Sequence, residues 1–186
     1  MSRGARSSLP RRSTPTTAVV SGLAAASMRG SLRLGSLAWA CALGRSGRRA
    51  RKREGDGATP VGCWRIAGVL YRADRVQRPR TGLPVRPIRT DDGWCDDPAD
   101  RNYNRAVRHP YPASAERLWR LDHVYDLVIV LTHNARPRVR GGGSAVFVHL
   151  ARPGFPPTEG CIALHPARLL QLLQRLGPGA RVRVLP

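Results

Sequence analysis

Lysine and acidic residues are scarce in this chain of 186 residues. Lys52 is the only lysine among 32 basic residues, against 12 acidic ones, so arginine supplies nearly all of the formal net charge of +20. This charge favours anionic surroundings such as phosphate-bearing polymers, lipid head groups or acidic peptides. The dense run Arg45–Arg53 has no aromatic residue between its charges and matches no nucleic-acid motif. We therefore rank a basic nucleic-acid-binding module below an enzyme and expect no nucleic-acid partner.

Aromatic residues are also few, at 5%, so aliphatic side chains must fill most of the core. A hydrophobic fraction of 41% argues against wholesale disorder, and no apolar run is long enough to cross a membrane. The four cysteines show neither a CxxC pair nor a compact disulfide spacing, so they do not fix a compartment. Cys41 and Cys95 could form a disulfide, but two packed free thiols are the simpler interpretation.

Residues 1–30 differ from the rest of the chain because they contain many Arg, Ser, Thr and Ala residues and no acidic one. The mildly apolar stretch Thr16–Met28 follows the Arg11-Arg12 pair, as in a secretory or twin-arginine signal. Ser, Gly and Thr interrupt that stretch, so a disordered leader or an over-extended start of translation stays open. We expect one domain over residues 31–186.

The domain is predicted to be mainly β with one or two helices. Short apolar runs between turn residues predict strands at 36–43, 64–71, 125–132, 144–150 and 181–185. Residues 78–112 are rich in Pro, Asp, Asn and Gly and indicate a long loop region with a short strand or two. Near residues 166–176, a helix is predicted by Pro166 at its start, five leucines on one face and Gly177 after its end.

The stretch Gly142–Leu164 combines residues that could do chemistry. A predicted strand ends in His149, a proline-containing loop follows, and Thr158-Glu159-Gly160-Cys161 leads into another apolar run. A thiolate rather than a thiol attacks carbonyl groups, and histidine is suited to take the thiol proton near neutral pH. Gly160 permits a sharp turn whose N–H groups could bind a developing oxyanion. The pattern indicates a Cys161 nucleophile with His149 as its base.

Two other interpretations of these residues remain open. A cysteine in an apolar context is often only packed in a core. Cys161 and His165 also have a spacing found in zinc sites, with His149 or His133 as a third ligand, although His165-Pro166 is better explained as the start of the helix. Glu54, Asp56, Asp96 and Asp97 could suggest a carboxylate pair or a metal site, but turn capping and local hydrogen bonding explain Asp in such Gly- and Pro-rich segments more simply. We expect no metal site.

Beyond this pattern, the chain resembles the L,D-transpeptidase (YkuD-type) catalytic domain family over residues 31–186. The resemblance rests on a strand ending in His, a loop and a Ser/Thr-x-Gly-Cys-aliphatic segment, in this order. Further matching pieces are Lys52–Gly62 with its Thr-Pro-x-Gly sequence, Gly93–Pro98, Tyr103–Arg105 and Gly143–Ala145. The resemblance implies a β-sandwich or barrel with a helix near the C-terminus.

The same resemblance implies a peptidoglycan L,D-transpeptidase of the bacterial cell envelope or periplasm. Cys161 would form a thioester with a stem tetrapeptide, His149 would move the protons, and Gly160 and Thr158 would shape the oxyanion pocket. An amine acceptor then gives a crosslink, while water as acceptor gives an L,D-carboxypeptidase or amidase-type hydrolase. No cofactor is implied, and the oligomeric state stays unknown.

Two positions depart from the family pattern. Many members have His immediately before Gly-Cys, where this chain has Glu159, and many have Arg two residues after the Cys, where it has Ala163. The second change removes an obvious anchor for a substrate carboxylate. Both changes affect the expected substrate and acceptor more than the nucleophile.

Overall fold

The computed structural model describes residues 16–186, and residues 1–15 lie outside the described part. It is mainly β with one helix among the described residues, which confirms the predicted fold class. The strands are β1 Thr17–Ser21, β2 Arg29–Leu34, β3 Leu37–Ala42, β4 Arg48–Arg49, β5 Thr59–Pro60, β6 Gly62–Tyr71, β7 Val85–Pro87, β8 Asp92–Cys95, β9 Arg105–Arg108, β10 Ala115–Arg117, β11 Leu127–Leu131, β12 Phe147–Leu150, β13 Ile162–Leu164 and β14 Arg181–Val184, and the helix is α1 Pro166–Leu173.

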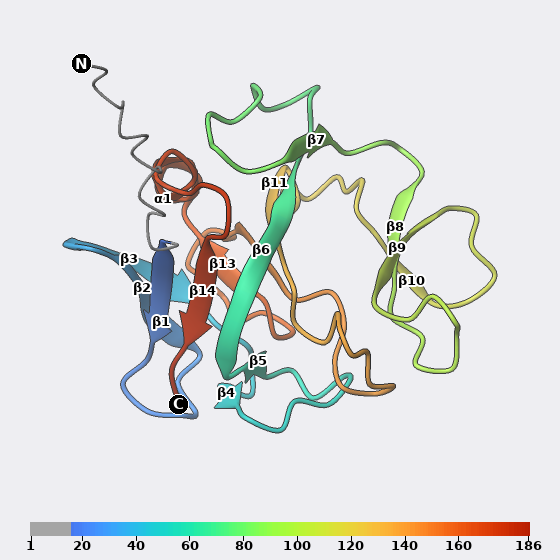
Figure 1. Cartoon of the computed structure of the whole chain (residues 1–186), viewed down its shortest axis with the longest axis horizontal. Coiled ribbons are helices and arrows are strands. Elements are labelled where there is room, and N and C mark those ends of the chain that lie inside the picture. Colours follow the sequence, from blue (N-terminus) through green and yellow to red (C-terminus); the bar gives the residue numbers. More distant parts are fainter. Residues whose placement is uncertain (1–15) are drawn as a thin grey trace, which may run out of the picture.

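A barrel forms the centre of the molecule (Figure 1). Its strands follow the order β11-β12-β13-β3-β2-β1-β14-β6, and β6 pairs with β11 so that the sheet closes on itself. Strand β7 extends the sheet beside β6, while β10-β8-β9 form a separate three-stranded sheet. Closure leaves β12 and β1 on opposite sides, because they are four places apart in a ring of eight.

The strands that were predicted from apolar runs form where expected. The continuous run of β11 is buried at all five positions because both of its faces are covered. In β14, arginines and valines alternate between exposed and buried positions, as expected for a strand with one face in solvent. The region 78–112, predicted as a long loop with a short strand or two, contributes the short strands β7, β8 and β9.

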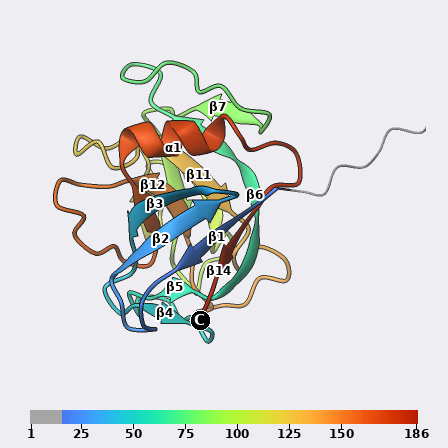
Figure 2. The same ribbon diagram turned by 90° about the vertical axis from the view of Figure 1, so that its left-hand side faces the viewer.

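Helix α1 lies across one end of the barrel (Figure 2). It begins at Pro166, after His165, whose side chain accepts a hydrogen bond from the backbone N–H of Ala167. Leu169, Leu172 and Leu173 are fully buried and join the barrel interior. The helix ends at Leu173, earlier than the predicted residue 176, yet Leu176 still packs into the same cluster.

The barrel has two outer sides of different character. A second hydrophobic cluster covers the outer face of β11 and β12, where Phe147 is buried beneath Leu118, Val124 and Tyr125. We call this side, together with the start of β13, the covered wall. The opposite side is the outer face of β2, β1, β14 and the first half of β6, and we call it the open wall.

The boundary predicted at residue 30 needs correction. Strand β1 and the first residues of β2 lie within the predicted leader, yet Ala18 and Val20 are fully buried in the barrel. Strand β1 pairs with β14 on one side and β2 on the other. The apolar stretch that resembled a signal is therefore partly a barrel strand, and the rest of the predicted leader, residues 1–15, lies outside the described residues.

Candidate active site

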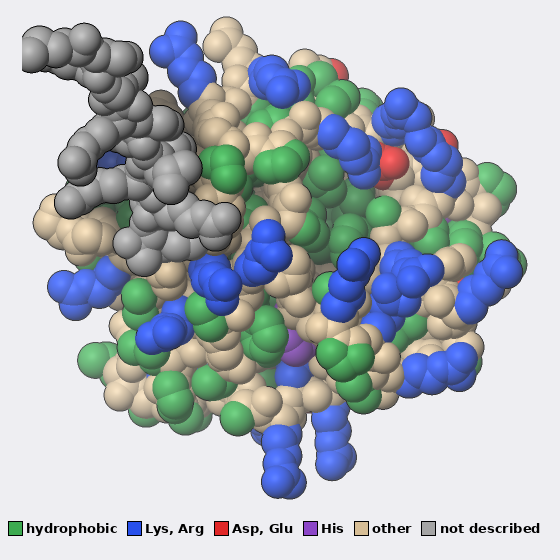
Figure 3. Space-filling model, viewed as in Figure 1, with side chains coloured by type: hydrophobic (Ala, Val, Ile, Leu, Met, Phe, Trp, Pro, Cys, Tyr) green, Lys and Arg blue, Asp and Glu red, His purple; other side chains and the backbone are tan. Residues whose placement is uncertain are grey.

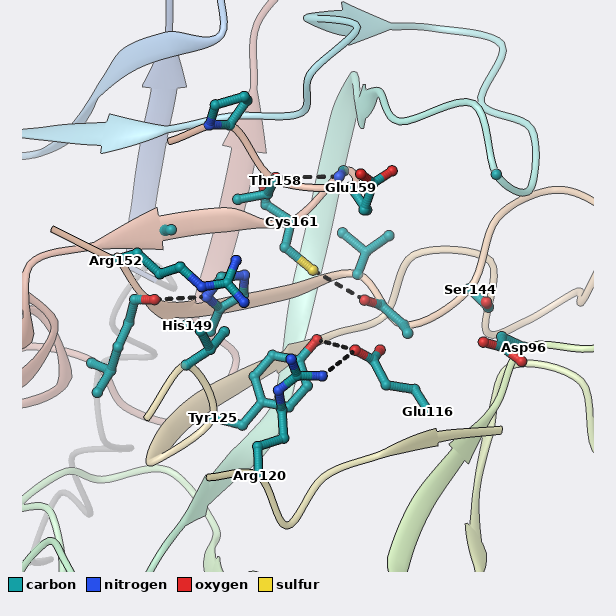
Figure 4. Close-up of a pocket in the computed structure, with 18 of the residues that line it drawn as sticks. Asp96, Glu116, Arg120, Tyr125, Ser144, His149, Arg152, Thr158, Glu159 and Cys161 are labelled. Atoms are coloured by element: carbon teal, nitrogen blue, oxygen red, sulfur yellow. Dashed lines mark hydrogen bonds and ion pairs between the residues drawn. The ribbon is translucent and has the colours of Figure 1, made fainter. Parts of the chain in front are cut away.

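Cys161 and His149 come from neighbouring strands of the covered wall. His149 is the third residue of β12, and Cys161 directly precedes β13. These strands are parallel, with Val148 opposite Ile162 and His149 opposite Ala163. Because successive side chains alternate between the two faces of a strand, His149 and Cys161 point to the same side, offset by two residues. Both line one cavity of about 640 Å³ on that wall (Figure 4).

The sulfur of Cys161 is held between two backbone groups. Its Sγ accepts a hydrogen bond from the N–H of Phe147 at 3.3 Å and donates one to the carbonyl of Ala145 at 3.2 Å. Burial raises the pKa of the thiol to about 12, and the nearby Glu116 carboxylate acts in the same direction, against the amide of Phe147 and the charge of Lys52. At neutral pH the group is therefore a thiol, which needs a base before it can attack.

His149 is set up as a neutral base. Its Nδ1 lies 3.0 Å from the carbonyl oxygen of Leu150, and since a carbonyl only accepts, Nδ1 carries the ring proton and Nε2 has the free lone pair. Burial lowers the pKa of the imidazole to about 4, and the ring meets Tyr125 edge-on with centroids 5.4 Å apart. Among the hydrogen bonds of residues 16–186, none joins this imidazole to Cys161.

The turn before Cys161 is shaped by Thr158 and Gly160. The Thr158 hydroxyl donates to the Cys161 carbonyl at 2.6 Å and accepts from the Gly160 N–H at 3.2 Å. Gly160 has φ +127°, and a Cβ there would lie 2.7 Å from the carbonyl oxygen of Ala58. Glycine is thus required by both conformation and space. The structure brings all four predicted site residues together around this turn.

The buried side chain of Lys52 packs next to this turn. Its side chain is only 5% exposed and forms an ion pair with Asp56, whose side chain is 10% exposed. The lysine stem fills the space that a Cβ on Gly143 would need, at 2.7 Å, and lies near Gly160. Burial would raise the pKa of Asp56, but hydrogen bonds from Lys52 and two backbone N–H groups bring it below its usual value.

Asn104 connects three of the segments that carried the family resemblance. Its Oδ1 accepts hydrogen bonds from Trp94 Nε1 at 3.0 Å and from the N–H of Ala145 at 3.1 Å. Its Nδ2 donates to the carbonyls of His133 and Asn134. Because the carbonyl of Ala145 accepts from the Cys161 thiol, Asn104 fixes the position of the group that holds the sulfur.

Several polar residues of the cavity lining were missed in the sequence. Glu116 accepts a hydrogen bond from the Tyr125 hydroxyl at 2.7 Å, and burial raises the pKa of both groups. Arg120 and Arg152 both bind Asp122, at 2.7 Å each, and also line the cavity. No local motif marks these residues, since only the fold brings residues 116–125 over the covered wall. For Lys52, the one feature of the sequence that could have drawn attention to it is that it is the only lysine of the chain.

The two departures from the family pattern have different surroundings. Glu159 points outward and pairs with Arg45 at 2.8 Å, with its side chain 78% exposed, so it does not supply a second buried proton carrier. Ala163 is buried opposite His149 in the strand register. The guanidinium groups of Arg120 and Arg152 are the cationic groups that lie in the cavity on the His149 side (Figure 4).

Several of the residues considered for a metal site make contacts that stabilise the fold. Within residues 16–186, no group of three or more His, Cys, Asp or Glu side chains is placed to hold a metal ion. His165 caps α1. Cys41, Cys63, Cys95 and Cys161 are all free thiols. The carboxylates of Glu54 and Asp56 bind Tyr103 and Lys52, respectively. In the described part of the chain, no helix has the length and apolarity of a membrane span.

Comparison with a family model identifies the family of the chain. The family model of the L,D-transpeptidase catalytic domain (YkuD) matches residues 24–184, so the chain belongs to this family. Among solved structures, L,D-transpeptidase 1 of Mycobacterium tuberculosis is similar at 12% identity, with a TM-score of 0.41. The match covers 92% of this chain and 62% of that one. A comparison with curated proteins finds no significant match.

Proposed function

We propose that the chain is a cysteine acyltransferase that acts on peptidoglycan stem peptides. The observation that carries the proposal is the shared cavity of Cys161 and His149, in which a thiol and an imidazole with a free Nε2 face the same side of two parallel strands. Family membership supports the reaction class. The place of action would be the bacterial cell envelope or periplasm.

In the first step, the Sγ of Cys161 attacks the carbonyl of the scissile peptide bond while its proton passes to Nε2 of His149. The S–C bond forms, the C–N bond breaks, and the released terminal residue leaves as an amine with the proton from the imidazolium. The low pKa of His149 makes this imidazolium a strong acid, suited to protonating a leaving amine. The product is a thioester on Cys161.

In the second step, an acceptor amine attacks the thioester carbonyl and gives its proton to Nε2 of His149. The C–S bond breaks, the thiol is re-formed, and a new amide joins two stems. Water in the place of the amine would yield a free carboxylate, which makes the chain a hydrolase of the same peptides. Thr158 and Gly160 shape the turn at which the oxyanion of both steps would form.

Arg120 and Arg152 are proposed to hold a carboxylate of the stem peptide. Guanidinium groups bind carboxylates with two parallel hydrogen bonds, and both side chains line the cavity near His149. They would take over from the family arginine that Ala163 replaces. Their shared partner Asp122 keeps them in place but also competes for their donors.

The proposal is tested by incubating the protein with a defined tetrapeptide muropeptide and measuring its intact mass. We expect an adduct of the stem minus its terminal residue, mapped by digestion to Cys161. Cys161→Ala should form no adduct and release no product, whereas Cys63→Ala, which removes a partly exposed thiol remote from the cavity, should behave like the wild type. An adduct that persists in Cys161→Ala would refute the assignment.

Transpeptidation and hydrolysis are separated by the products. With excess acceptor stem, a crosslinked dimer indicates transfer to an amine, and a shortened stem alone indicates hydrolysis. Both outcomes require the same thioester, so the mass experiment comes first.

A further inference from the structure

The open wall carries a group of outward-facing arginines on three of its four strands. Arg33, Arg65, Arg181 and Arg183 are all exposed, from β2, β6 and β14. Arg181 lies directly opposite Arg65, and Val19 of β1 lies between Arg183 and Arg33 in the register. The four side chains therefore project from one continuous surface, which we call the arginine surface.

No acidic residue balances this surface. All 12 acidic residues of the chain fall between Glu54 and Glu159, so β1, β2, β3 and β14 contain none, and residues 1–15 add none. Among the described residues, no ion pair involves any of the four arginines. Figure 3 views the molecule from this side, where blue side chains are spread over the face and red ones appear only toward one edge.

The fold itself does not explain this arrangement. Like charges directly opposite each other on antiparallel strands destabilise a sheet, and Arg65 and Arg181 form such a pair. Their neighbours on the outer face, Thr17, Val19 and Cys63, offer no negative charge. An external anion would remove the repulsion, so the arginine surface fits an anionic partner.

An apolar loop lies at the border of the same wall. The β1–β2 connection, residues 22–28, exposes Leu23 completely and Met28 to 47%. The buried Arg48 fixes this loop, because its guanidinium donates to the carbonyls of Gly22 and Ala24, and also to Leu185 after β14. The charged side chain of Arg48 thus holds the exposed Leu23 beside the arginine surface.

We propose that the open wall binds the surface of an anionic lipid bilayer, with the arginine surface against the phosphate head groups and Leu23 inserted among them. Basic residues next to exposed apolar side chains favour this partner, since each arginine near the surface and each inserted apolar group adds to binding. A soluble polyanion would gain nothing from Leu23. The outward positions of the wall also offer no aromatic platform for nucleic-acid bases.

This orientation has a consequence for the catalytic cavity. Strand β12, which carries His149, lies across the barrel from β1. With the open wall on a bilayer, the cavity would face away from the lipid, where a polymer can reach it. The binding proposal does not depend on the chemistry of Cys161, and each can fail without the other.

The test is co-sedimentation of the full chain with vesicles of phosphatidylglycerol and phosphatidylcholine, against vesicles of phosphatidylcholine alone, at about 0.15 M salt. We expect binding to the anionic vesicles only. The triple variant Arg65→Gln, Arg181→Gln, Arg183→Gln should lower the partition coefficient by about tenfold or more. Leu23→Ser should lower it severalfold, by a similar factor at low and high salt, because the apolar contribution is not screened.

The matched control is the triple variant Arg89→Gln, Arg101→Gln, Arg105→Gln, which removes three exposed arginines that lie outside the open wall. The two triple variants therefore have the same net charge. It should retain most of the binding. Equal losses in the two triple variants would show a mere net-charge effect and overturn the proposal. Equal binding to both kinds of vesicle would also overturn the proposal, as would vesicle binding by Leu23→Ser that equals that of the wild type. A preference for duplex DNA or isolated peptidoglycan over anionic vesicles would overturn it as well. Cys161→Ala should bind vesicles like the wild type.

Discussion

On the covered wall, arginines are tied to carboxylates, whereas on the open wall they have none. Arg120 and Arg152 share Asp122 next to the cavity of Cys161 and His149, while Arg65 and Arg181 lie opposite each other on two neighbouring strands. Arginines that share a carboxylate keep fixed positions, and so they can define a site of atomic precision. Arginines without partners create a field that attracts a diffuse anionic surface.

The two walls also differ in what covers them. The β8–β10 sheet and residues 116–125 lie over the covered wall and keep His149 and the sulfur of Cys161 away from bulk water, which moves both pKa values far from their ordinary range. No described element lies over the four open-wall arginines, which remain exposed. The proposed reaction, which needs groups removed from water, is thus placed on the covered wall, and the proposed binding of an anionic surface, which needs exposed arginines, is placed on the open wall. The following predictions test whether the two functions are separate.

The largest effect is expected for His149→Ala. Removal of a general base costs about 10²- to 10⁴-fold in rate, and the resting thiol of Cys161, with its pKa of about 12, has no other neutral base in the cavity. The measurement is the rate of thioester formation by intact mass, with vesicle binding as the control property. Loss of vesicle binding in the same variant, with the fold intact, would break the separation of the walls.

Lys52→Met is expected to destabilise the protein by about 3 kcal/mol, because it leaves the buried carboxylate of Asp56 without its cation. Chemical denaturation measures the change, and Arg53→Met, which removes a neighbouring exposed cation, is the control with little expected effect. Lys52→Arg should not restore stability, since Gly143 and Gly160 leave no room for a guanidinium. Full stability in Lys52→Arg would show that the charge alone matters there.

Much of the covered wall could be predicted because its information is local in the sequence. Strand, loop, turn and nucleophile follow one another within Gly142–Leu164, and continuous apolar runs marked β11 and β12. The partners Glu116, Tyr125 and Asn104 come from distant segments, and only tertiary packing brings them to Cys161. Asn104 lies in one of the segments that resemble the family, whereas the sequence around Glu116 carries no signal that distinguishes a cavity residue from a loop residue.

The open wall was harder to predict because the sequence of β1 is compatible with both a signal segment and a barrel strand. An apolar segment behind a pair of arginines is typical of a signal, but five residues with alternate burial also form a barrel strand. Barrel closure decides between them, since β14 and β2 need a strand between them, and closure is a property of the whole chain. The absence of acidic residues was visible in the sequence, but the strand register was needed to show that the arginines share one face.

The stability of the covered wall should depend on pH through His149. Burial lowers its pKa from 6.5 to about 4, so between these values the unfolded chain binds a proton that the folded chain does not. Stability is therefore complete above pH 6.5 and falls as the pH decreases toward 4, by about 2 kcal/mol at pH 5. Denaturant unfolding at pH 7 and 5 should show a loss of stability that is about 2 kcal/mol larger in the wild type than in His149→Gln. His133, whose pKa burial also lowers, stays in both proteins and cancels.

The smallest effect concerns the open wall, where we expect a gain in stability. Arg65→Gln removes the cross-strand repulsion with Arg181 and should raise the free energy of unfolding by a few tenths of a kcal/mol at low salt. Arg183→Gln is the control, since the residue opposite it is the uncharged Cys63. In a double-mutant cycle, Arg181→Gln should add nothing once Arg65 is replaced, because the repulsion is already gone. Additive gains would mean that the two guanidinium groups do not interact, and the pair would then be no evidence for an anionic partner.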